Sequence, residues 1–169
     1  GKHKDTFNNI QKVREVVINM GNYSMAEQMS LASSPYSAEV DEFVKSGFNK
    51  VKSDLVQPHR LKESPVQFEC KVLEIKQLGN KGGAGNLIIC EILKIHISTD
   101  VLDDNQMIDQ QKIVLIARMG GNWYSRTEKK SMFEITKPIT TIGIGFDELP
   151  IEILNSNILT GNELGKLAG

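Results

Sequence analysis

The sequence has few of the features that mark specialised classes of protein. Its 169 residues include two cysteines and one tryptophan, and only 6% are aromatic. Basic and acidic residues nearly balance, 20 against 21, and no long block of either sign occurs. Such a chain has no strong field to steer it onto nucleic acid or an anionic membrane. We therefore expect neither nucleic acid nor a membrane as a partner.

Long apolar runs and paired cysteines are missing as well. No run approaches the length of a membrane span, and the opening residues GKHKDTF lack the apolar core of a secretory signal, so we expect a cytoplasmic protein. Cys70 and Cys90 lie in apolar runs, without a second pair or histidines at the spacing of metal ligands. We expect buried free thiols and no metal site.

The composition is that of an ordinary globular domain, with 40% hydrophobic and 24% charged residues. The first periodic segment follows Asp5 and Thr6, either of which can serve as a helix N-cap, and Phe7 and Ile10 recur at helical spacing. The β-branched run from 16 to 18 does not alternate, which predicts a strand buried on both faces. Two further short helices are expected, the second ending at Gly47.

The clearest strand pattern runs from residue 66 to 78. Apolar residues alternate with polar ones up to Val72, after which the apolar phase jumps to Leu73 and Ile75. Such a jump predicts a β-bulge or a sharp bend, and bent strands are typical of a barrel. Residues 87 to 97 read as the partner strand, so the two runs predict a long antiparallel hairpin.

The loop QLGNKGGAGNLII, residues 77 to 89, joins these two runs. A phosphate-binding glycine loop must lead into a helix whose N-terminus holds the anion, whereas this loop leads into a strand. We therefore interpret it as a turn.

The N-terminus of the first helix is the better candidate for an anion site. Its leading N–H groups have no partners within the helix, its dipole end is positive, and Lys2, Lys4 and the Thr6 hydroxyl converge there. An ordinary capped helix with solvated lysines is the alternative, and the residues by themselves leave both open.

A second candidate is the stretch RMGGNWY. Gly120 and Gly121 would let the backbone approach a flat ligand, and Trp123 and Tyr124 offer ring faces or a hydroxyl. The alternative is a glycine turn flanked by core aromatics.

The histidines offer no catalytic constellation. His59 and His96 read as surface histidines, and no Ser-His-Asp or Cys-His arrangement can be assembled. We therefore predict no catalytic side chain.

Five segments in order carry a family resemblance: KDTFNNI followed by EVVIN, SSPYSAEVDEFVKSGF, PHRLKESPVQFECKV, GNLIICEILKIHI and ARMGGNWYSR. The chain resembles the flavin reductase-like proteins along essentially its whole length. The resemblance implies a mainly β fold with short α-helices, namely the FMN-binding split β-barrel with Greek-key topology.

The resemblance also implies a function. Proteins of this kind bind FMN at a homodimer interface and pass hydride between NAD(P)H and the flavin, whose ring does the redox chemistry. By similarity, Lys4, Asp5 and Thr6 lie at the flavin phosphate and Asn19 lines the flavin. Gly120, Gly121 and Tyr124 match a Gly-Gly-x-Tyr element near the nicotinamide.

Members of the family carry a segment before the point where this sequence starts, including the first barrel strands. We therefore expect one domain over residues 1–169 that lacks its N-terminal strands. The leading hypothesis is an NAD(P)H:FMN oxidoreductase. The alternative is a non-catalytic split-barrel module that binds a phosphate-bearing ligand or a protein partner.

Overall fold

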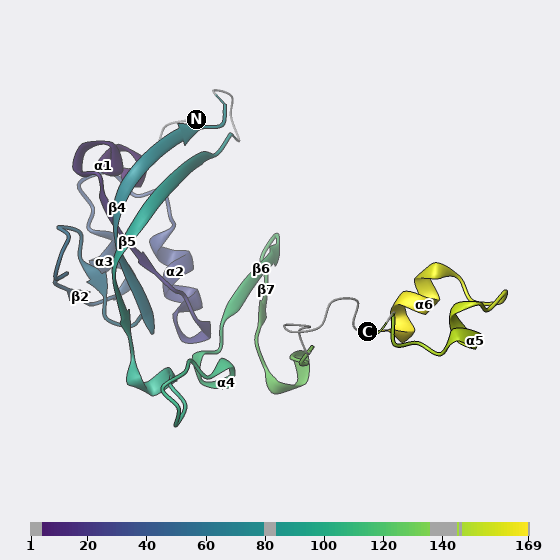
Figure 1. Ribbon diagram of the computed structural model, residues 1–169. Helices are drawn as coiled ribbons and strands as arrows, with labels where there is room; N and C mark the ends of the chain where they lie inside the picture. The colour runs from purple at the N-terminus through teal and green to yellow at the C-terminus, as the bar shows by residue number, and fades with distance from the viewer. Residues whose placement is uncertain (1–4, 80–83, 136–144, 146, 169) are drawn as a thin grey trace. The chain divides into compact units, whose positions relative to one another are not determined.

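The computed structural model describes residues 5–79, 84–135, 145 and 147–168 (Figure 1). The chain divides into two compact units, Gly1–Met132 and Phe133–Gly169. The expectation of a single domain over 1–169 stays a prediction. In the part described, no helix is long and apolar enough to span a bilayer.

The first unit contains most of the regular structure. In chain order its elements are α1 (Asp5–Val13), β1 (Glu15–Asn19), η1 (Tyr23–Met25), α2 (Ala26–Ala32), α3 (Glu42–Ser46), β2 (Lys50–Val51), β3 (Arg60–Leu61), β4 (Val66–Gln77), β5 (Asn86–Ile97), η2 (Thr99–Val101), α4 (Gln110–Ile113), β6 (Ile116–Gly120), β7 (Trp123–Arg126) and η3 (Lys129–Ser131). The second unit has two short helices, α5 (Ile151–Leu154) and α6 (Gly161–Leu167).

The first unit is built on an antiparallel sheet in the order β1-β4-β5. Figure 1 shows β4 and β5 as two long, curved strands that run side by side, and their antiparallel pairing confirms the predicted hairpin. The register shifts between Val72 and Glu74, where the apolar phase jumps in the sequence, and also between Glu69 and Cys70. The predicted bulge is therefore present. The connection after Gln77 leads into a strand, as predicted, and the turn prediction itself falls on residues 80–83, which lie outside the described part.

The sheet is open within the described residues, so it shows no closed barrel. Among the strands that the structure describes, β1 pairs only with β4, and none lies on the outer edge of β5. Burial of β1 on both faces is therefore wrong for this chain: Ile18 is 43% exposed, because no described element covers it. The mainly β architecture with short helices agrees with the prediction.

Two groups of apolar residues hold the first unit together. Phe7 and Ile10 bury one face of α1, as their spacing predicts. A second cluster joins Val66, Val101 and Ile113, so the start of β4 packs against the segments that follow β5. α3 ends at Gly47, which adopts the left-handed conformation (φ 71°) expected of a helix-terminating glycine.

Candidate functional site

The first helix is held firmly while its N-terminal end stays accessible. At its C-terminal end the Arg14 N–H donates to the Ile10 carbonyl (3.0 Å), and the Val72 N–H donates to the Arg14 carbonyl (2.9 Å). Asp5 and Thr6 are both exposed, and Lys4 lies outside the described residues. The helix starts at Asp5, so the N-cap prediction for Asp5 or Thr6 is wrong: both lie in the first turn.

This helix end has the chemistry of an anion site with one opposing charge. The first-turn N–H groups and the Thr6 hydroxyl can donate to a phosphate, whereas the Asp5 carboxylate already complements the positive end of the helix dipole. An anion therefore needs added positive charge here, and the neighbouring lysines Lys2 and Lys4 in the sequence can supply it.

Asn19 ends β1, and its side chain has a structural task. Its Oδ1 accepts a hydrogen bond from the Leu61 N–H at 3.0 Å. The amide thus ties the end of β1 to β3, and the position predicted to line a flavin is fixed in place by this bond.

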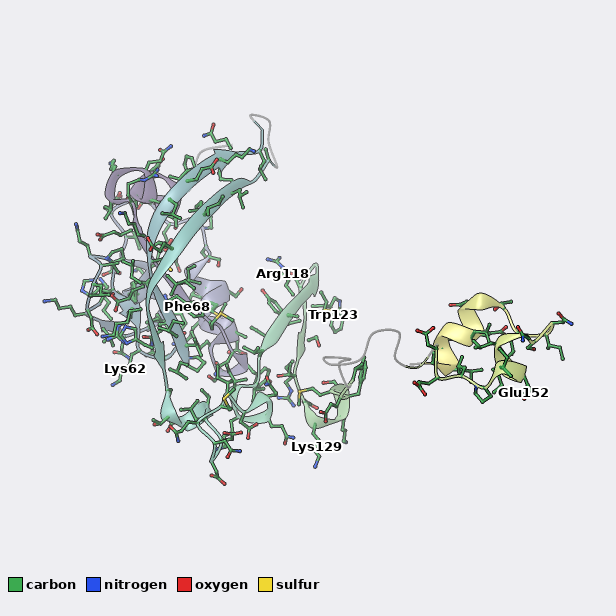
Figure 2. All side chains as sticks on the ribbon, in the orientation of Figure 1. Lys62, Phe68, Arg118, Trp123, Lys129 and Glu152 are labelled. Carbon is green, nitrogen blue, oxygen red and sulfur yellow. The ribbon has the colours of Figure 1, made fainter. Side chains whose placement is uncertain are left out.

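The RMGGNWY stretch forms the β6–β7 hairpin. Gly120 and Gly121 form its tip with positive φ values of 106° and 52°, and a Cβ on either would meet no atom within 4 Å. Trp123 and Tyr124 are 78% and 47% exposed, so the turn is confirmed but the core-aromatic alternative is wrong. Figure 2 shows Arg118 and Trp123 standing clear of the hairpin ribbon, and the Arg118 Nη2 donates to the Gly121 carbonyl (3.3 Å).

Among the described residues, the candidate positions on α1 and on the β6–β7 hairpin lie apart in Figure 1. Asn19 is bonded to the Leu61 N–H, and the hairpin tip is bonded to Arg118. The base of the hairpin is anchored elsewhere, through the Tyr23 N–H to the Val114 carbonyl (3.0 Å).

A buried carboxylate on β4 was missed by the sequence reading. Glu69 is fully buried, and its oxygens accept hydrogen bonds from the N–H groups of Asp54 (2.9 Å) and Leu55 (2.6 Å). The His96 Nε2 lies 2.6 Å from Oε1, and the Arg60 Nε lies 3.6 Å from the same oxygen. His96 is therefore not a surface histidine, whereas His59 is exposed as predicted.

These contacts reverse the usual effect of burial on the carboxylate. Burial alone would raise the pKa of Glu69. The hydrogen bonds from the Asp54 and Leu55 N–H groups and from His96 outweigh this effect and lower the pKa from 4.5 to about 2. Glu69 is thus ionised at neutral pH. The alternation along β4 places Glu69 among its polar positions but does not show that this position is buried. The signal in the sequence for the pair is a carboxylate and an imidazole on the polar faces of two paired strands.

The cluster of Asp54, Glu69 and His96 has the residue types of a metal site, with ligand atoms within 4.8 Å of one another. Proton donors already occupy it, however. Besides the donors on Glu69, the Lys94 Nζ lies 2.6 Å from the Asp54 Oδ2. A cation would have to compete with Lys94 and with Arg60, so the geometry fits a charge-balanced anchor for the loop after β2.

The two cysteines are free, as predicted. Cys70 is fully buried and Cys90 half-buried. Burial raises the pKa of both thiols. Neither is an activated nucleophile.

Comparison with known proteins identifies the family. The model of the flavin reductase like domain matches residues 1–116. The chain belongs to the flavin reductase-like family. An uncharacterized protein of Aquifex aeolicus (strain VF5) is 32% identical over 121 residues, which cover 72% of this chain and 60% of that protein. The chain thus spans about 60% of the length of this curated relative.

Solved structures give the same fold. Nitrilotriacetate monooxygenase component B from Bacillus cereus is similar with a TM-score of 0.72 at 20% identity, covering 80% of this chain and 66% of that one. A protein of Shewanella frigidimarina NCIMB 400, described as having a split barrel domain, has a TM-score of 0.66 at 24% identity, covering 78% and 65%. The chain therefore belongs to the flavin reductase-like family and shares the fold of these neighbours.

Proposed function

We propose that this member of the flavin reductase-like family binds FMN and transfers hydride from NAD(P)H to the flavin. The observation that carries the proposal is the accessible N-terminus of α1, held in place by Phe7 and Ile10, in a chain whose matched segment includes it. The flavin ring supplies the redox chemistry when bound, which agrees with a chain that offers no catalytic triad.

In this proposal each candidate side chain has its own role. Thr6 and the first-turn N–H groups bind the phosphate, and Lys4 adds the charge that offsets Asp5. Asn19, held by its bond to β3, lines the ring. Gly120 and Gly121 leave open space at the hairpin tip, which lets a nicotinamide approach the backbone beside Tyr124.

We propose a homodimer as the working form in the cytoplasm. β5 exposes large apolar side chains on both of its faces at 41% to 52% of their surface: Leu87, Ile89, Ile92, Leu93, Ile95 and Ile97. Its outer edge has no described strand partner, and a long apolar edge of this kind favours pairing with another strand. In this proposal a second copy of the chain, together with strands that close the Greek-key barrel, covers the outer edge of β5.

A flavin titration tests the proposal. The purified protein should take up FMN with quenching of flavin fluorescence, and NADH or NADPH should bleach the 450-nm region, roughly the usual flavin absorption band, under anaerobic conditions. Replacing Lys4 and Thr6 by alanine together should weaken FMN binding, because each hydrogen bond to the phosphate is worth roughly 1 to 3 kcal/mol.

Two results would count against this assignment. An affinity for FMN that is unchanged in the double variant would place the phosphate elsewhere. Bound flavin that neither nicotinamide nucleotide reduces would remove the hydride-transfer step and leave FMN binding alone.

The second candidate function is a non-catalytic module that binds a phosphate-bearing ligand or a protein partner. The separation of α1 from the β6–β7 hairpin within one chain favours it, since a lone helix end can hold a phosphate without a redox site. A colourless protein that takes up no FMN and oxidises no NAD(P)H would support this reading.

A further inference from the structure

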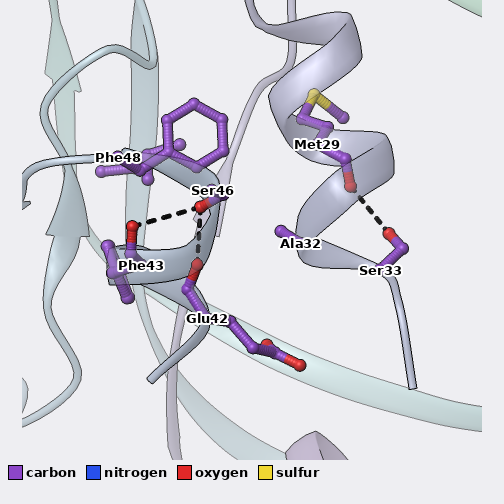
Figure 3. A pocket seen from close by; sticks show the side chains of 8 residues that line it. Met29, Ala32, Ser33, Glu42, Phe43, Ser46 and Phe48 are labelled. Carbon is purple, nitrogen blue, oxygen red and sulfur yellow. Dashed lines mark hydrogen bonds between the residues drawn. The ribbon is translucent and has the colours of Figure 1, made fainter. Parts of the chain in front are cut away.

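A cavity of about 280 Å³ lies between α2 and α3. Its apolar lining comes from Met29 and Ala32 on α2, Phe43 on α3, and Phe48 and Leu61 beyond it (Figure 3). An apolar cavity of about 150 Å³ accepts benzene, so this one has room for a substituted ring. The lining itself favours such an occupant, because two aromatic rings and a thioether make good contacts with a flat apolar group.

The two hydroxyl groups in the lining are already engaged. The Ser33 Oγ donates to the Met29 carbonyl (2.9 Å) and the Ser46 Oγ donates to the Glu42 carbonyl (2.6 Å), as the dashed lines in Figure 3 show. Neither serine therefore has its proton available for an occupant. The polar chemistry of the cavity has to come from its remaining polar side chain.

That side chain is Glu42, which alone among the lining residues carries a charge. Figure 3 shows it extending from the start of α3 toward the side where Ser33 lies. Glu42 is exposed in the first turn of α3, and no hydrogen bond or ion pair to its carboxylate is found among the described residues. The Lys50 Nζ lies 5.1 Å from the centroid of the Phe43 ring and is paired with Asp41. The cavity thus combines an apolar, ring-bearing lining with one solvent-exposed carboxylate that has no side-chain partner among the described residues.

We propose that this cavity binds a small molecule that consists of a compact apolar ring carrying a protonated amine. The ring lies among Met29, Phe43 and Phe48, and the ammonium group pairs with the Glu42 carboxylate. An anionic ring compound is disfavoured, because its charge would meet that of Glu42 without a free cation in the lining.

The site is distinct from the proposed phosphate site on α1 and does not depend on it. Binding of the amine can therefore be tested on protein that contains no flavin. One residue links the two sites, because Leu61 lines the cavity and its N–H donates to the Asn19 side chain.

Benzylamine is a suitable probe, with benzyl alcohol as its neutral match. In titrations followed by protein amide resonances, benzylamine should bind saturably and shift the signals of Ala32 and Phe43 most. Ala32→Leu should fill the cavity and weaken both probes at least about ten-fold. Glu42→Gln should weaken benzylamine about two- to five-fold, the range of an exposed ion pair, and leave benzyl alcohol unchanged.

Glu27→Gln is the matched control, because Glu27 is an exposed glutamate on α2 that does not line the cavity. Equal effects of Glu42→Gln and Glu27→Gln on benzylamine would overturn the charge assignment. Signal changes that never saturate, or that map away from Ala32 and Phe43, would overturn the site, and this mapping requires no variant to fold. These results leave FMN binding, measured separately, untouched.

Discussion

Replacing Glu69 by glutamine is expected to lower the free energy of unfolding by about 3 kcal/mol at pH 7. Glutamine keeps the shape of the side chain, but its NH2 group replaces one of the two carboxylate oxygens, which between them accept hydrogen bonds from the Asp54 and Leu55 N–H groups and from His96. The pKa falls from 4.5 to about 2, and at about 1.4 kcal/mol per pKa unit this corresponds to about 3 kcal/mol.

The sign of the pH dependence follows from the lowered pKa. The ionised carboxylate contributes its full stabilisation above pH 4.5, the value for the unfolded chain, and loses it as the pH falls toward about 2. The difference between the original protein and Glu69→Gln should therefore be largest at neutral pH and shrink between these two values. Urea unfolding followed by circular dichroism at several pH values measures it.

A matched control lies on the same strand. Glu74 is exposed on β4, so Glu74→Gln should change the free energy of unfolding by less than about 0.5 kcal/mol at every pH. The reasoning would be refuted if Glu69→Gln behaved like this control at pH 7. It would also be refuted if its effect stayed constant down to pH 2, since the loss would then not come from the ionised carboxylate.

Three further outcomes are expected. Lys94→Ala should cost less than about 1 kcal/mol in urea unfolding and lose its effect in high salt, because the pair with Asp54 is almost half exposed (42% and 46%). Gly120→Val should destabilise the hairpin by about 1 to 3 kcal/mol, seen as faster amide exchange in β6 and β7, because φ is 106° there. Cys70 and Cys90 should react slowly with iodoacetamide at pH 8 until urea unfolds the chain, because burial raises the pKa of both thiols; rapid labelling of the folded protein would contradict this.

The elements that sequence patterns predicted are those set by local rules. The spacing of Phe7 and Ile10 sets the buried face of α1, Gly47 ends α3, and the phase jump after Val72 marks the bulge in β4. Each depends on a few neighbouring residues, so a reading of the sequence is sufficient. The turn at Gly120 belongs to the same class.

The features that were misread depend on contacts distant in the sequence. Whether Ile18 is covered depends on what lies across β1, and periodicity within the strand carries no such information. Glu69 and His96 lie on the polar faces of their strands. The loop that holds Asp54 contacts Glu69 through its N–H groups, so the Glu69–His96 pair is covered. Only the folded arrangement shows which polar face is covered.

The layout of the candidate flavin residues bears on how many chains form the proposed site. The β6–β7 hairpin is fixed at its base by the Asn22–Leu115 bridge and by the Tyr23–Val114 hydrogen bond, which tie it to the segment after β1. Under the proposed function, we expect a flavin whose phosphate lies at α1 to meet the glycine tip of a second copy. The exposed apolar side chains on β5 would give that copy a surface on which to pack, and a monomer that bound and reduced FMN at full affinity would show this expectation to be wrong.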